Sequence, residues 1–197
     1  MKKFYKDIEC PKCKNTFKTQ VTGSQLIPDF YLDMKPIRKD RVSEQQHSCP
    51  ICGYTWYILC DLTVGFDSPA ENMYEVYKTA LEQTTNFEQK LFVLLHYAWE
   101  LEYDGKTDEA IFIRTQITDV IAEHIVEDPK VELILLYIEN CRLTNQFEEA
   151  DKAIEALNSF MSEHGHERPK FLKLYEYMTQ LVANKDSSPH LLSEIKD

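Results

Sequence analysis

Four of the six cysteines stand in two pairs with identical spacing, and these pairs are the residues best suited to chemistry. Cys10 and Cys13 belong to CPKC, and Cys49 and Cys52 belong to CPICG. Two residues between cysteines let one tight turn direct both sulfurs, and its own backbone N–H groups, at a single ion. Two such pairs predict one Zn²⁺ per chain, held by four thiolates. Because no coordination position is left open, the zinc is expected to be structural.

Three other interpretations of the pairs are iron with the same ligands, a redox site and unrelated free thiols. A redox CxxC usually begins a helix within a βαβ unit, and neither pair has that setting. The sequence does not separate zinc from iron. Proline presets the turn in each pair, and Gly53 is expected to take a positive φ after the second pair. We expect Asn15 to do the same after the first, since Asn tolerates the left-handed region.

The residues around the pairs predict short strands. FYKDIE precedes Cys10, TFKTQVT follows Cys13 and YTWYILCDL follows Cys52, and β-branched and aromatic residues dominate these runs. The pattern then changes to helix, where Ser68 is the expected N-cap and Glu71 its capping-box partner. The predicted fold class is α+β: a small zinc-ribbon β module at residues 1–65, followed by an all-α, tetratricopeptide-like helical-hairpin domain at residues 66–197.

The second part predicts five or six helices with short connections, because apolar residues recur at helical spacing. The clearest runs begin near Phe87, Ala110, Ile134, Phe147 and Phe171. DGKTDEAI and TNQFEEAD occupy the same place in successive hairpins, and this echo is similar to the tetratricopeptide repeat, in which a small residue lets two helices approach closely. Ala110 and Ala150 lie 40 residues apart, against about 34 in that repeat, so the similarity extends only to a tetratricopeptide-like arrangement.

Stacked hairpins of this kind line a concave groove with the first helix of each pair. Matching the hairpins by their alanines places eight residues there: Phe92, Leu95, Trp99, Glu102, Tyr103, Leu135, Glu139 and Arg142. Because this set is aromatic and acidic, the partner expected in the groove is a protein or peptide segment that is basic or amphipathic.

The same sequence resembles a family of uncharacterised bacterial proteins, catalogued as a domain of unknown function, with an N-terminal CPxC knuckle, a second CPxCG knuckle and a tetratricopeptide-like helical tail. The resemblance covers nearly the whole chain and is carried by CPKCKNTFKTQ, PDFYLDMKP, CPICGYTW and the helical remainder. RKDRVSEQQH departs from the longer Asn-Pro-Tyr-rich stretch of that family. The resemblance implies an architecture and a metal, and it supplies no activity.

Composition and charge limit the function classes. The net charge is -11, but residues 1–65 hold 10 Lys and Arg against 7 Asp and Glu, whereas the remainder holds 12 against 26. The excess of cations in the first part is too small to predict nucleic-acid binding by itself. No stretch is long and apolar enough for a membrane span or a signal peptide, so we expect a cytoplasmic protein with reduced thiols and no membrane partner.

The sequence favours a non-enzymatic adaptor, in which a structural zinc ribbon is joined to an acidic helical groove that binds a protein or peptide. It contains no HExxH, no GxSxG and no glycine-rich phosphate loop. The alternative is a nucleic-acid-associated regulator that uses the ribbon, the cations of the loop at residues 21–46, and Tyr54 and Trp56 as a stacking surface. Core packing is the other explanation for Tyr54 and Trp56.

Overall fold

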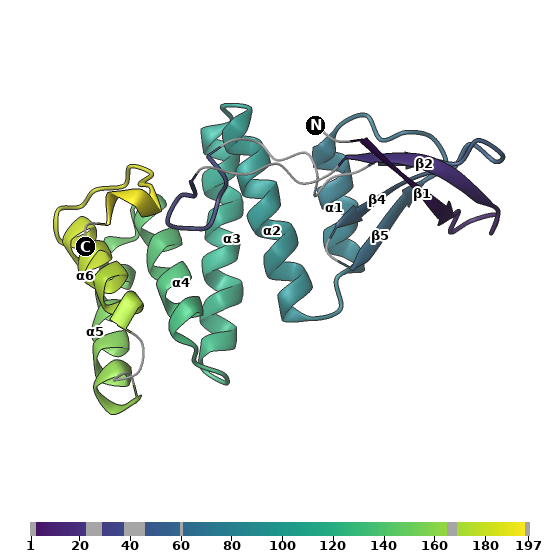
Figure 1. Cartoon of the computed structure of the whole chain (residues 1–197). Helices are drawn as coiled ribbons and strands as arrows, with labels where there is room; N and C mark the ends of the chain where they lie inside the picture. The colour runs from purple at the N-terminus through teal and green to yellow at the C-terminus, as the bar shows by residue number, and fades with distance from the viewer. Residues whose placement is uncertain (1–2, 23–28, 38–45, 60, 165–168, 196–197) are drawn as a thin grey trace. The chain divides into compact units, whose positions relative to one another are not determined.

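Small antiparallel sheets precede a helical C-terminal region, as the predicted α+β fold class requires. The computed structural model describes residues 3–22, 29–37, 46–59, 61–164 and 169–195. β1 (Lys3–Glu9) and β2 (Thr16–Thr22) form a hairpin, while β3 (Gln46–Ser48), β4 (Thr55–Leu59) and β5 (Leu62–Phe66) form a three-stranded sheet in that order. Six helices follow: α1 (Met73–Gln83), α2 (Phe87–Tyr103), α3 (Thr107–Ile125), α4 (Val131–Leu143), α5 (Phe147–His164) and α6 (Pro169–Ala183) (Figure 1).

The chain divides into two compact units whose segments alternate along the sequence. The first unit comprises Met1–Ile27 and Arg38–Glu100, and the second comprises Pro28–Ile37 and Leu101–Asp197. A short segment between the two cysteine pairs therefore belongs to the helical unit. Its described part, residues 29–37, is called the strap below. The boundary between the units also falls within α2, before its last turn.

In the first unit, α1 packs against β5 and buries Val76, Tyr77 and Ala80. The start of α1 differs from the prediction. Its N-cap is Asn72, whose side-chain oxygen accepts a hydrogen bond of 3.1 Å from the backbone N–H of Glu75. The predicted N-cap, Ser68, lies four positions earlier, outside the helix. Asn satisfies an orphan N–H at a helix start as well as Ser does.

In the second unit, successive helices from α3 to α6 pack against one another, and α4 also contacts α6. Ile138, Leu157 and Met178 lie at the centre of the core, which Leu32 of the strap joins. Ala110 and Ala150, the two residues of the sequence echo, are 2% and 0% exposed. Both are therefore buried in the helical unit, as expected of residues on the packed face of a helix.

The ends of three helices share one local geometry. Gly105, Asn145 and Lys185 follow α2, α4 and α6 with φ of 73°, 62° and 51°. In each case the next N–H bonds back to a carbonyl five residues earlier: the distances are 2.8, 2.8 and 2.9 Å for residues 106, 146 and 186. This is the Schellman motif, which satisfies the last carbonyls of a helix and turns the chain sharply. The echo between DGKTDEAI and TNQFEEAD thus corresponds to the same helix end in both places.

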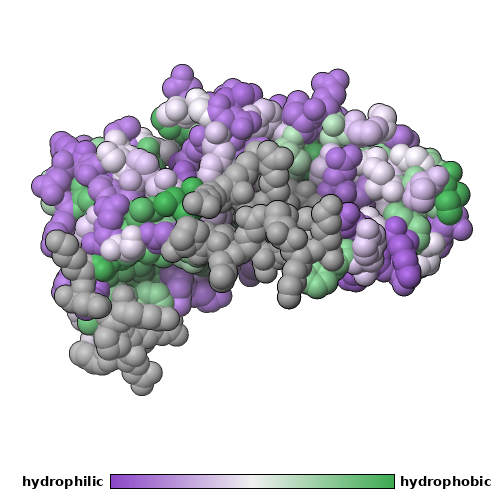
Figure 2. Space-filling view, turned by 45° about the horizontal axis from the view of Figure 1, so that its top comes forward, coloured by the Kyte–Doolittle hydropathy of each residue, from purple (hydrophilic) through white to green (hydrophobic). Residues whose placement is uncertain are grey.

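Polar side chains predominate on the face of the molecule that Figure 2 shows, with hydrophobic ones in small separate patches. Among the described residues, no helix is both long enough and apolar enough to cross a membrane.

Candidate metal centre

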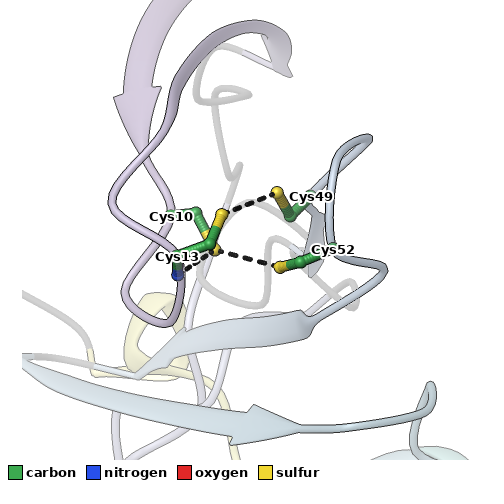
Figure 3. Close-up of side chains that lie close together, drawn as sticks. All are labelled: Cys10, Cys13, Cys49 and Cys52. Carbon is green, nitrogen blue, oxygen red and sulfur yellow. Dashed lines mark hydrogen bonds between the residues drawn. The ribbon is translucent and has the colours of Figure 1, made fainter.

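The four predicted metal ligands lie together in the first unit. The sulfur of Cys10 lies 3.7 Å from that of Cys52, and the sulfur of Cys13 lies 3.6 Å from that of Cys49. All four ligand atoms are within 4.8 Å of one another (Figure 3). A tetrahedral ion with metal–sulfur bonds of about 2.3 Å spaces its sulfurs by about 3.8 Å. The distances from Cys10 to Cys52 and from Cys13 to Cys49 match that spacing, and the cluster could hold one metal ion.

The two cysteine turns, or knuckles, have the same backbone geometry. In the first, Cys10 N–H donates to the Asn15 carbonyl (2.9 Å) and Lys14 N–H donates to the Cys10 carbonyl (3.0 Å). The second knuckle, residues 49–54, has the equivalent bonds at 2.8 and 3.0 Å. Gly53 has the predicted positive φ, 74°. In the first knuckle the prediction was wrong, because Lys14 and not Asn15 takes the positive φ, at 62°. The turn fixes the position of this residue at one after the second cysteine, whatever its type.

Asn15 acts on the sulfur instead of on the turn. Its side-chain amide donates to the Cys13 sulfur (3.4 Å), and the N–H of Cys13 lies 3.5 Å from the Cys10 sulfur in donating geometry. Hydrogen bonds from the Asn15 side chain and backbone lower the pKa of the Cys13 thiol to about 6. N–H donors stabilise a thiolate, which is the form that binds metal.

Cys52 shows the opposite effect. A backbone hydrogen bond from Tyr54 lowers its pKa, but burial and hydrogen bonds to the other three sulfurs outweigh this and raise the pKa to about 12. Four sulfurs this close cannot all carry a negative charge without a cation among them, because like charges suppress one another's ionisation. The donor set therefore fits a thiophilic dication, whose charge allows all four thiols to ionise.

Trp56 supports the cysteine cluster from β4. It is 3% exposed and forms a small core with Cys10 and Cys49, against which Phe17 packs at a ring-centroid distance of 6.1 Å. Tyr54 stacks on Trp56 at 6.4 Å. At 3% exposure, Trp56 presents no ring face to solvent. Core packing therefore explains this aromatic pair, and a surface for stacking bases does not.

Two further cysteines lie outside the cluster. Cys141 is fully buried on α4, and burial raises the pKa of its thiol to about 12, so it stays protonated and unreactive. Cys60 lies outside the described residues, as do most of the loop cations considered for nucleic-acid binding, at residues 38–45.

The eight residues predicted to line a groove are divided between the two units. Phe92, Leu95 and Trp99 lie on α2 in the first unit. Phe92 and Leu95 are half-buried, and Trp99 is 9% exposed. His96 stacks on Phe92 (4.2 Å between ring centroids) and lies against Trp99 (4.7 Å). Burial lowers the pKa of His96 to about 4, so the ring is neutral at physiological pH and forms part of an aromatic row.

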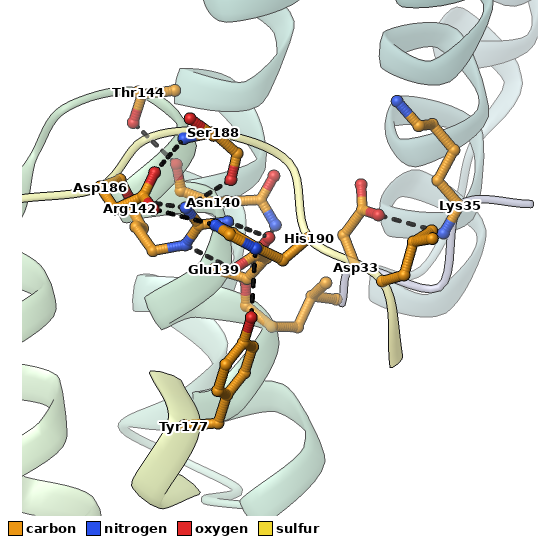
Figure 4. Close-up of polar contacts among 12 residues, drawn as sticks. Asp33, Lys35, Glu139, Asn140, Arg142, Thr144, Tyr177, Asp186, Ser188 and His190 are labelled. Carbon is orange, nitrogen blue, oxygen red and sulfur yellow. Dashed lines mark hydrogen bonds and ion pairs between the residues drawn. The ribbon is translucent and has the colours of Figure 1, made fainter. Parts of the chain in front are cut away.

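The other groove residues belong to the second unit, where α4 buries three of them. Leu135 is part of the apolar core and is 4% exposed. Glu139 and Arg142 are at most 1% exposed and form an ion pair through two hydrogen bonds of 2.7 and 2.9 Å. Arg142 also donates to the carbonyls of Asp186 and Ser188 in the segment after α6 (Figure 4).

The strap contacts the remaining two groove residues, Glu102 and Tyr103. Lys35 pairs with Glu102 at 2.5 Å, and the Tyr103 hydroxyl donates to the carbonyl of Pro36. Asp33, which is 1% exposed, pairs with Arg114 of α3 at 2.6 Å. The structure thus shows a polar cluster around the strap that the sequence analysis missed.

The segment after α6 holds the strap from its other side. Leu32 N–H donates to the carbonyl of His190 (3.0 Å), and Leu192 N–H donates to the carbonyl of Phe30 (2.8 Å). The His190 ring lies between the carboxylates of Asp186 (3.0 Å) and Glu194 (2.7 Å). The contacts between the strap and this segment arise only in the tertiary fold, whereas Asp186, His190 and Glu194 are spaced four residues apart in the sequence.

Comparison with known proteins gave no family model, no curated protein and no solved structure that matches this chain.

Proposed function

We propose that this chain is a non-enzymatic adaptor in which one structural Zn²⁺ folds the cysteine-bearing unit and the protein binds a protein or peptide partner. The convergence of four cysteine sulfurs within 4.8 Å of one another carries the proposal. Four thiolates complete the coordination of zinc, so the ion has no position for water or substrate and serves to hold the two knuckles together.

Zinc is proposed rather than iron because its role is structural and needs no change of oxidation state. The two knuckles lie 36 residues apart, between Cys13 and Cys49, and they have identical hydrogen bonding. Binding a structural zinc contributes on the order of 10 kcal/mol to folding, judged from zinc-finger peptides. An ion in this position therefore stabilises the hairpin β1–β2 on the sheet β3–β4–β5.

The partner site that we propose is the face of α2 bearing Phe92 and Leu95. These two residues belong to the predicted groove and remain half-buried, whereas Leu135, Glu139 and Arg142 are buried. Aromatic and aliphatic side chains spaced along one helix face are the usual anchors for an amphipathic peptide. A basic or amphipathic segment also fits the acidic charge of the chain.

The metal part is tested on the purified full chain by elemental analysis together with titration of free thiols. The expected result is one zinc per chain, with four cysteines protected until the metal is chelated. Cys49→Ser should lose the metal, and Cys141→Ser, which changes a buried thiol outside the cluster, should keep it. Iron in place of zinc, or full zinc retention by Cys49→Ser, would contradict the proposal.

The partner part is tested by quantitative cross-linking of the wild-type chain in cells, followed by binding of each recovered protein to purified variants. Phe92→Ser combined with Leu95→Ser should abolish binding. Phe112→Ser, which removes a 66% exposed Phe from α3, is the matched control and should bind normally. Equal binding by both variants would rule out the α2 face, and turnover of a metabolite by the purified chain would refute the non-enzymatic role.

A further inference from the structure

A pocket of about 320 Å³ lies entirely within the second unit. The strap, α3, α4 and the segment after α6 line it, and Figure 4 shows Asp33, Lys35 and Glu139 among the polar side chains there. Its volume is at the lower end of the range of about 300 to 1,000 Å³ that is typical of small-molecule sites. The pocket is therefore of a size for a metabolite rather than for a peptide.

Charged side chains of both signs line this pocket: Asp33, Glu102 and Glu139 are acidic, and Lys35 and Arg114 are basic. Asp33, Arg114 and Glu139 are at most 2% exposed. Burying a charge costs several kcal/mol, and buried ion pairs often stabilise a fold no better than apolar residues of the same volume. A set of buried charges around a cavity is therefore more readily explained by ligand binding than by stability.

Two of these groups retain hydrogen-bonding capacity beside the pocket. Arg114 has five N–H donors and uses three, to Glu102 (2.5 Å), Asn140 (2.8 Å) and Asp33 (2.6 Å). Each carboxylate oxygen of Glu139 accepts one bond from Arg142 and has a further lone pair. Among the described residues, two Arg114 donors and two Glu139 acceptor positions are thus left for a ligand.

The ionisation of Glu139 reflects the same surroundings. Burial raises the pKa of its carboxyl, and hydrogen bonds from Arg142 oppose that rise. The charge of Asp33 raises the pKa further, and the charge of Arg114 lowers it. A cationic group in the pocket would favour the carboxylate form, so the binding of an ammonium and the ionisation of Glu139 support each other.

Apolar residues complete the lining. Ala110 and Ile111 of α3, Leu143 at the end of α4 and Pro189 after α6 all line the pocket. A ligand that satisfied only the charged groups would leave this wall in contact with water. An aliphatic side chain against the wall would release that water, which is favourable because apolar surface is removed from water.

We propose that the pocket binds a free aliphatic α-amino acid. The ligand carboxylate accepts hydrogen bonds from Arg114, the ammonium donates to Glu139, and the aliphatic side chain packs on Ile111 and Leu143. An anion alone would leave the free acceptor positions of Glu139 unfilled, and a cation alone would leave the free donors of Arg114 unfilled. A zwitterion fills both, so it is the preferred ligand. This ligand site is distinct from the metal centre and from the α2 face, and it goes beyond the adaptor function.

Isothermal titration of the full-length, zinc-loaded chain tests the proposal with three probes that share the same branched aliphatic group. Leucine carries both charges, isocaproate lacks the ammonium and isoamylamine lacks the carboxylate. Leucine should bind with a dissociation constant at least about tenfold below that of either analogue, equivalent to about 1.4 kcal/mol. The absence of saturable leucine binding at millimolar concentration, or equal affinity for an analogue, would overturn the proposal.

A variant that fills the pocket locates the site. Thr107, an exposed residue at the start of α3, lines the pocket, and Thr107→Trp adds an indole there without removing a buried charge. The matched control is Thr85→Trp, at an exposed position in the first unit. Thr107→Trp should lose leucine binding while its circular dichroism stays native, and Thr85→Trp should bind as wild type. Unchanged binding by Thr107→Trp would place the ligand elsewhere and refute the assignment.

Discussion

Removal of the metal is the perturbation with the largest expected effect, and Trp56 is the natural reporter. Trp56 is 3% exposed and packs on Cys10 and Cys49 in a core that has just these three buried residues among the described part of the chain. A buried Trp removes about 200 Å² from water, worth about 5 kcal/mol. The proposed zinc would contribute on the order of 10 kcal/mol, judged from zinc-finger peptides, and would therefore be the larger stabilising factor.

The total stability of a small domain is about 5 to 15 kcal/mol. Losing the metal therefore removes most of the free energy that folds the region around Trp56. The hairpin β1–β2 should lose its packing on β4, and Trp56 should become exposed to water. The core of the second unit, around Ile138 and Leu157, forms a separate cluster and should remain folded.

Tryptophan fluorescence measures this effect directly. The chain has two Trp residues, so Trp99→Phe leaves Trp56 as the single reporter. Chelation should shift its emission to longer wavelength and increase quenching by acrylamide, and added zinc should reverse both changes. Hydrogen exchange should show loss of protection in β1 and β2 and retained protection in α4 and α5. If Trp56 stayed shielded after complete metal removal, the reasoning on the structural role would be refuted.

Three further predictions concern single positions. Asp33→Ala removes one of the two carboxylates that pair with the buried Arg114 and should lower the free energy of unfolding by about 3 to 5 kcal/mol. Urea denaturation followed by circular dichroism measures this. A loss no larger than that caused by replacing an exposed Asp with Ala would contradict it. The two carboxylates beside His190 raise its pKa, although partial burial lowers it. The stabilisation of the fold by His190 is therefore fully present below about pH 6.5 and is lost as the pH rises through the raised folded-state pKa. An NMR titration that gave an ordinary or lowered pKa would disprove this. Gly65→Ala places a Cβ in steric conflict with the Tyr54 hydroxyl and should destabilise the cysteine-bearing unit by about 1 to 3 kcal/mol. Thermal unfolding measures this, and an unchanged melting temperature would contradict it.

Local spacing predicted the part of the candidate site that depends on local geometry. Two residues between cysteines fix a tight turn through local backbone geometry alone. The sequence was therefore enough to identify Cys10, Cys13, Cys49 and Cys52 as one group. The positive φ of Gly53 followed from the same turn. The corresponding error, Asn15 in place of Lys14, arose because residue preference was weighed above position within the knuckle.

The helices were predictable for a similar reason, since the period of apolar residues is a local property of the chain. No run of strand-forming residues marked β3, because its three residues are too few for a periodic signal, although His47 was expected to lie in a strand. The start of α1 was misplaced because Ser68 and Asn72 are both residue types that cap helices, and in the structure Asn72 makes the cap hydrogen bond. Helix ends at Gly105 and Asn145 share one geometry, which the echo between their sequences indicated.

The sequence by itself determined which four cysteines lie together, the α+β class and the approximate positions of five helices. Tertiary structure alone decided that the strap belongs to the helical unit, that Asp33 meets Arg114 across 81 residues, and that Glu139 and Arg142 are buried partners. Asp33 and Arg114 lie far apart in the chain, and the burial of each charged pair depends on several segments that pack together around it. Local signals specify turns and periods, but the pairing of buried charges exists only when the whole unit has folded around them.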